Sequence, residues 1–179
     1  MIKTFKHFVI ILGLLAAQFS LVPILPGVFR EVDVVLTGII FLCIAYEFYL
    51  GVIYAVIFGL VLDLYSSLPF GAALISLLVT LFVVYEVSKH LLTNKSYYAL
   101  LGLSLLSTII HGIIINLYQL AKYFIQSKDV YLAKQLWLFS AANLFWQLLL
   151  NACLISIVFI IFHATSRRFK AVFIDTTKR

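Results

Sequence analysis

Charged residues are scarce in this chain, and their scarcity excludes most soluble folds. Only 11% of its 179 residues are charged and 64% are hydrophobic, whereas a soluble domain carries about 25% charged residues. Cysteine is also rare: Cys43 and Cys153 both fall inside apolar stretches without further ligands at metal spacing, so neither a disulfide nor a metal site is indicated. The length allows about six helices of about 20 residues and little else. The sequence therefore predicts one all-α integral membrane domain over residues 1–179.

Familiar catalytic patterns are missing as well. The chain contains no GxSxG, no HExxH, no phosphate-binding glycine loop and no close carboxylate pair suited to general acid and base catalysis. We therefore expect a protein that is not an enzyme and uses no cofactor. An intramembrane enzyme without a recognisable motif is the least favoured class.

Six apolar stretches follow one another along the chain. They cover residues 8–25, 34–46, 49–65, 71–88, 97–121 and 137–163, and a tail follows at 164–179. Two lysines precede the first stretch, as in a signal peptide, but no convincing cleavage site follows, so we interpret it as an uncleaved helix. The boundary at Glu47 is the weakest, because residues 34–62 could instead form one strongly tilted helix of about 43 Å in a hydrocarbon core about 30 Å thick.

The distribution of basic residues favours six crossings. With six crossings and a cytoplasmic N-terminus, nine of the 13 Lys and Arg residues lie on the cytoplasmic side, whereas five crossings would reverse the positive-inside bias. The nine are Lys3, Lys6, Lys89, Lys95, Arg167, Arg168, Lys170, Lys178 and Arg179. We therefore predict six transmembrane helices with both termini and the tail cytoplasmic. The net charge of +6 then reflects topology and contact with the lipid bilayer, and it does not indicate a nucleic-acid partner.

Polar side chains inside the last two stretches form two faces. On the fifth stretch, Ser104, Ser107, Thr108, His111, Gln119 and Lys122 fall within a sector of about 120°. On the sixth, Asn143, Gln147 and Asn151 follow at intervals of four. These groups need partners inside a membrane, so they either hold helices together or line a polar cavity. The predicted cavity comprises Asp63, Glu86, His111, Asn116, Asn143 and Gln147, and it would hold a small ligand or a partner's transmembrane helix.

Asp63 is a lone carboxylate in the third stretch. A charged group at membrane depth costs about 2.5 to 3.5 kcal/mol on insertion scales, so it needs a partner. It could cap a helix or contact the turn that follows, or it could pair with a donor such as His111. Glu86, in contrast, precedes Lys89 by three residues, which favours an ion pair at the membrane boundary.

Small residues recur every four positions on the same stretch as Asp63. Gly51, Ala55 and Gly59 form a ridge that would let another helix approach closely. This ridge could pack against a partner's helix or against another helix of the same chain.

The stretch GLVLDLYSSLPFGAALISLLV resembles the signature region of the rod shape-determining protein MreD family, with Gly59, Asp63 and Gly71 matching in order. The resemblance implies a multi-pass protein of the bacterial inner membrane that works in the cell-wall elongation machinery. It also implies a non-enzymatic role, a single-pass MreC-like partner, and contact with MreB and with RodA and its penicillin-binding protein. The implied fold is a bundle similar to the S components of energy-coupling-factor vitamin transporters.

Two functions therefore remain open. The favoured one is a scaffold that binds the transmembrane helix of a partner. The alternative is a substrate-binding S component of a vitamin transporter, which six short spans and a polar cavity would also suit. Its expected alanine-rich docking surface is not evident, because the alanines are scattered.

Overall fold

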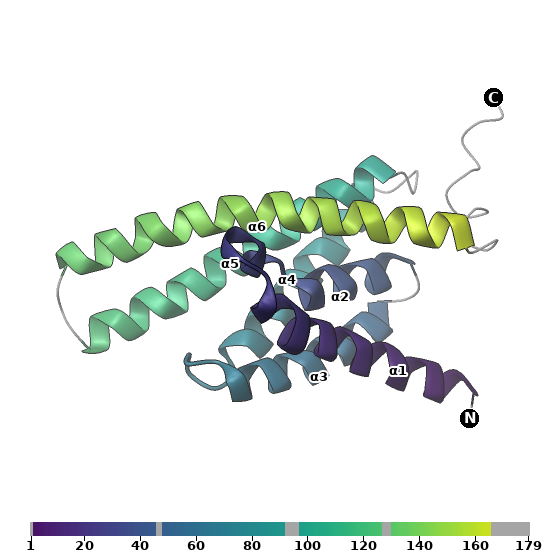
Figure 1. The fold of residues 1–179 in the computed structure, drawn as a ribbon, viewed down its shortest axis with the longest axis horizontal. Helices are drawn as coiled ribbons and strands as arrows, with labels where there is room; N and C mark the ends of the chain where they lie inside the picture. Colours follow the sequence, from purple (N-terminus) through teal and green to yellow (C-terminus); the bar gives the residue numbers. More distant parts are fainter. Residues whose placement is uncertain (1, 46–47, 92–96, 127–129, 166–179) are drawn as a thin grey trace.

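The structure, a computed structural model, describes residues 2–45, 48–91, 97–126 and 130–165, and all the regular secondary structure among them is helical (Figure 1). The α-helices are α1 (Ile2–Ala16), α2 (Val34–Ala45), α3 (Phe48–Tyr65), α4 (Ala72–Leu91), α5 (Tyr97–Gln126) and α6 (Val130–Thr165). The predicted number of helices is confirmed. Glu47 and most of the predicted tail lie outside the described residues.

The first predicted helix, 8–25, is helical as far as Ile24, but only its first part is an α-helix. α1 ends at Ala16, and the chain continues through a π-helical turn, η1 (Ala17–Leu21), and two 3-10 turns, η2 (Val22–Ile24) and η3 (Gly27–Glu31). Pro23 and Pro26 explain why the helical stretch ends at Ile24 and does not continue as an α-helix, since proline has no N–H to donate and its ring clashes with the preceding turn of an α-helix. The segment therefore folds back toward the bundle before α2 begins.

Val34–Ala45 and Phe48–Tyr65 are separate helices that pack against each other, and they do not form one long tilted helix. α2 has only 12 residues, a length of about 18 Å, so it does not reach across a core about 30 Å thick by itself. Of the described helices, α3, α4, α5 and α6 are long and apolar enough to cross a membrane. The predicted six crossings and the cytoplasmic position of the termini remain predictions.

α2 is the centre of the bundle. It contacts α3, α4, α5 and α6, and its side chains are almost all enclosed. Fully buried positions on it include Val35, Leu36, Ile39 and Ile40. A helix that is apolar on every side belongs in a core surrounded by other helices, which explains why this segment shows no polar face in the sequence.

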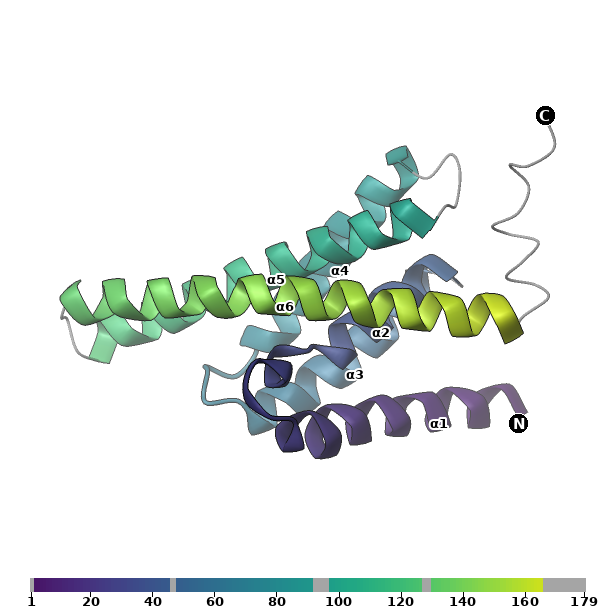
Figure 2. The ribbon, with the colours of Figure 1, turned by 45° about the horizontal axis from the view of Figure 1, so that its top comes forward.

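α5 and α6 form a long antiparallel hairpin along one side of the bundle (Figures 1 and 2). They have 30 and 36 residues, so both extend further than the predicted 97–121 and 137–163. Both helices therefore continue past the apolar stretches into segments that carry charged residues such as Lys122. At one end of the molecule, the end of α5 and the start of α6 extend further out than the loop between α3 and α4 (Figures 1 and 2).

The small-residue ridge on α3 faces the chain's own helices. A Cβ atom at Gly51 would lie 3.0 Å from Cβ of Cys43 on α2, and one at Gly59 would lie 2.6 Å from Cα of Leu74 on α4. Ala55, between them, is fully buried. The ridge thus serves internal packing of α3 against α2 and α4.

Replacing Gly59 with alanine should destabilise the protein. The added methyl group would meet backbone of α4, which cannot rotate away as a side chain can, so the two helices must separate at a cost of about 1–3 kcal/mol. Gly102→Ala is the matched control, because a Cβ at Gly102 meets nothing within 4 Å. Thermal unfolding of the purified variants in detergent measures both, and equal melting temperatures for the two would contradict this packing.

Candidate functional site

Asp63 caps a helix other than its own. Its carboxylate accepts hydrogen bonds from the backbone N–H groups of Gly71 (3.0 Å), Ala73 (2.8 Å) and Leu74 (3.2 Å) at the start of α4. The N–H of Ala72 is bonded to the carbonyl of Pro69 instead (3.1 Å). Because the first N–H groups of a helix have no partner within it, a buried carboxylate placed there satisfies several donors and also complements the positive end of the helix dipole. Of the two roles considered for Asp63, the structure gives it that of a cap.

The residues Gly59, Asp63 and Gly71 form one structural unit. Gly59 lies one turn before Asp63 and lets α3 approach α4 closely, so that the carboxylate reaches the start of α4. Gly71 has a φ of 96°, a conformation that strongly favours glycine, and this turns its N–H toward Asp63. The spacing of the three residues therefore encodes a close helix contact, a cap and the turn between them.

The start of α2 is satisfied in a similar way by three side chains. The Asp33 carboxylate accepts from the Leu36 N–H (2.8 Å), and Gln18 in η1 accepts from the Val34 N–H (2.9 Å). The Asn151 side chain on α6 accepts from the Asp33 N–H (2.9 Å) and donates to Thr108 on α5 (3.1 Å). Polar residues from four segments thus meet at one helix end, and Asn151 is fully buried there.

His111 joins this cluster to α4. Its Nδ1 lies 2.8 Å from the Ser76 hydroxyl, and its Nε2 lies 3.7 Å from the Asp33 carboxylate. Serine, histidine and aspartate are also the components of a hydrolase triad, but here the serine contacts Nδ1 and not Nε2. Ser76 is also fully buried and does not line the cavity described next, so a substrate has no route to its hydroxyl. The geometry favours a structural role for these three residues.

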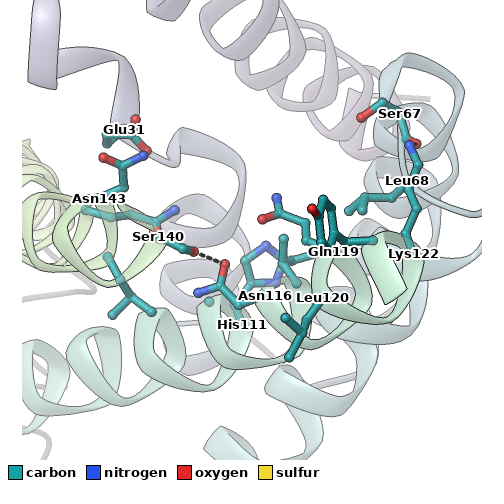
Figure 3. A pocket seen from close by; sticks show the side chains of 15 residues that line it. Glu31, Ser67, Leu68, His111, Asn116, Gln119, Leu120, Lys122, Ser140 and Asn143 are labelled. Atoms are coloured by element: carbon teal, nitrogen blue, oxygen red, sulfur yellow. Dashed lines mark hydrogen bonds between the residues drawn. The ribbon is translucent and has the colours of Figure 1, made fainter. Parts of the chain in front are cut away.

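A polar cavity of about 540 Å³ lies between α5 and α6, next to η3 and the loop between α3 and α4 (Figure 3). Its lining includes four side chains predicted from the sequence, namely His111, Asn116, Asn143 and Gln147. Asn116 accepts a hydrogen bond from Ser140 across the two helices. The cavity is thus built from the two polar faces seen in the sequence.

Three residues proposed as possible site members lie elsewhere. Asp63 is occupied at the start of α4, and Asn151 lies at the start of α2. Glu86 forms an exposed ion pair with Lys89 at 2.8 Å, as the three-residue spacing indicated. None of these three lines the cavity.

Sequence reasoning missed several residues of the site. Asp33 precedes an apolar stretch directly, which is the usual position of a helix N-cap and could have identified it. Gln18 is an isolated amide within the first apolar stretch, which signals a need for a partner. Glu31 lines the cavity, and burial raises its pKa above the ordinary value. The position of Glu31 at the cavity depends on how the segment 17–33 folds against the helices, and no local pattern predicted that arrangement.

Replacing Asp63 with asparagine should destabilise the protein although the side-chain shape is kept. The amide offers one acceptor oxygen in place of two, so at least one buried N–H at the start of α4 loses its partner, at a cost of about 1–3 kcal/mol. Glu86→Gln is a matched control, since Glu86 is exposed. Unfolding in detergent would be measured for both, and a stability of Asp63→Asn equal to that of the control would refute the cap.

Replacing Asn151 with alanine should cost more stability than the same change at Gln147, one turn earlier on α6. Asn151→Ala leaves the partly buried Asp33 N–H without its acceptor, at a cost of about 1–3 kcal/mol, whereas Gln147 lines the cavity, where water replaces it. The comparison uses the same unfolding measurement. A larger loss at Gln147 would show that the polar contacts at α2 contribute little.

Comparison with known proteins assigns the chain to a family. The family model described as rod shape-determining protein MreD matches residues 1–168, nearly the whole chain. No curated protein and no solved structure gives a significant match. The match includes the unit of Gly59, Asp63 and Gly71 whose geometry is described above. The chain therefore belongs to the MreD family of membrane proteins, whose role is in the determination of rod shape.

Proposed function

We propose that this protein is a non-enzymatic scaffold of the bacterial inner membrane that acts in cell-wall elongation by binding a single-pass, MreC-like partner through its membrane helices. Membership of a family of shape-determining proteins supports the process. The polar groups closest to a catalytic arrangement are enclosed and hold helices together, which supports the non-enzymatic part.

The observation that carries the partner proposal is the free surface of α6. Only 11% of its membrane-spanning window is buried within the chain, against 33–39% for α3, α4 and α5. Its exposed residues include Phe145, Trp146, Leu149, Ile157 and Ile160. A long helix held by its neighbours on one side only leaves room for another transmembrane helix, and helix association in membranes depends on such packing.

The small-residue ridge on α3 is not the partner surface in this proposal. Gly51 and Gly59 are already in close contact with α2 and α4, so a second helix could not approach them. The partner's helix is therefore assigned to α6 instead. Large aromatic side chains such as Trp146 offer it extensive contact area.

Site-specific photo-crosslinking tests this assignment. A photoreactive phenylalanine derivative at position 146 on α6 should give an adduct with the single-pass partner in native membranes. The same residue at position 82 on α4, where Phe82 is also exposed, should give none. Equal adducts at both positions, or an adduct only at position 82, would remove α6 as the binding surface.

Purification from the native membrane in a mild detergent tests the broader proposal. Mass spectrometry should identify the single-pass partner and wall-synthesis proteins with the tagged chain. The polar cavity favours the alternative of a transporter S component. Recovery of ATPase subunits with a bound vitamin-like molecule would replace the scaffold by that alternative.

A further inference from the structure

Polar side chains from two facing helices meet in one part of the cavity between α5 and α6. Ser140 on α6 donates a hydrogen bond to Asn116 on α5, which places these two positions opposite each other. Gly112 lies one turn before Asn116, and a Cβ atom there would be 3.8 Å from Oε1 of Gln147 on α6. The polar groups of both helices are therefore gathered within about 10 Å along the helix axes.

The carboxamides in this part of the cavity have spare hydrogen-bonding capacity. Asn116 accepts from Ser140, whereas Asn143 and Gln147 form no hydrogen bond with any described residue. Each carboxamide has two N–H donors and an oxygen that accepts. Glu31 lies on the same side of the cavity as Asn143 (Figure 3), and its carboxylate forms no ion pair with the described residues. Inside a membrane protein such groups need water or a polar ligand as a partner.

This lining suits hydroxyl groups better than it suits a single charge. An ammonium group offers donors only and would leave carboxamide N–H groups unpaired, whereas an anion offers acceptors only and would face the Glu31 carboxylate. A hydroxyl group both donates and accepts, as a carboxamide does. Apolar side chains complete the lining and can contact the C–H groups of a ring that carries hydroxyls. These side chains include Ile115, Leu120 and Leu144.

We propose that this part of the cavity binds a neutral sugar unit, whose hydroxyl groups pair with the carboxamides of Asn116, Asn143 and Gln147. The Glu31 carboxylate accepts from a further hydroxyl, and such charge-assisted hydrogen bonds are among the stronger ones. Lys122 has no part in the site, because its ammonium already donates to a backbone carbonyl. The cavity volume of about 540 Å³ lies in the range usual for small-ligand sites.

Two sources carry this chemistry, namely the headgroup of a glycolipid and a free sugar. The purified full chain, in a detergent without a sugar group, would be incubated with equal amounts of four lipids that share the same acyl chains. The four are monoglucosyl diacylglycerol, diacylglycerol, phosphatidylglycerol and lysyl-phosphatidylglycerol, and native mass spectrometry measures which of them stays bound. We expect the glucosyl lipid to bind about tenfold more tightly than each of the others, because it alone presents a neutral ring of hydroxyl groups.

Replacement of a single carboxamide tests the site itself. Gln147→Met keeps the length of the side chain and removes its donors and acceptor, so it should weaken binding of the glucosyl lipid about threefold to tenfold and leave diacylglycerol unchanged. Asn143→Leu should act in the same direction. Glu86→Met is the matched control, since Glu86 is exposed and does not line the cavity, and it should change nothing. Melting temperatures in the same detergent identify the variants that are folded.

The outcomes are distinct from those of the partner experiments because no partner is present. Binding of maltose, or its displacement of the bound lipid, would support a free sugar as the ligand, and a glucosyl lipid that maltose does not displace would support a glycolipid. Equal binding of the four lipids would overturn the proposal, as would the absence of binding by all four and by maltose. Tightest binding of lysyl-phosphatidylglycerol would overturn it too, because Glu31 would then recruit a cation. An unchanged preference in a folded Gln147→Met variant would have the same consequence.

Discussion

A helix that begins inside a membrane protein has N–H groups that neither water nor lipid can satisfy, and the protein must bring acceptors to them. This constraint organises the present fold at two points. Asp63 reaches from α3 to the start of α4, and Gln18, Asp33 and Asn151 converge on the start of α2. The polar residues that look out of place in an apolar sequence are thus largely the acceptors that allow two helices to begin where they do.

The same contacts determine the shape of the cavity. Asp63 binds the N–H of Gly71 at the end of the loop that contributes Ser67 and Leu68 to the cavity lining. Asp33, held by Asn151, follows directly on η3, which packs against α6 and carries Glu31 into the cavity lining. The capping residues therefore do not belong to the cavity, yet they hold the segments that carry much of its polar lining. A polar site in a membrane protein needs such support, since every group that faces inward must keep its partner.

The sequence predicted the helix number, the break between α2 and α3 and the inward polar faces of α5 and α6, because these depend on composition and on periodicity along a single segment. The sequence also singled out Asp63, because the free-energy cost of placing a carboxylate in an apolar stretch can be recognised from the neighbouring residues alone. It could not choose between a cap and a distant pairing, since that choice depends on how closely α3 approaches α4 at Gly59. It did not predict that residues 17–24 depart from α-helical hydrogen bonding or how the turns up to Asp33 are held, because these depend on contacts to α2 and α6 made far away in the sequence.

The enclosure of α2 has a consequence for biogenesis. Asn151, which accepts the hydrogen bond from Asp33, is 118 residues later in the chain. When a ribosome has completed α2, its final surroundings do not yet exist, because α5 and α6 are still to be made. The short central helix must therefore wait in the membrane or at its surface, with its first N–H groups provisionally satisfied, until the last helix arrives. The polar contacts at the start of α2 can therefore form only after α6 has been made.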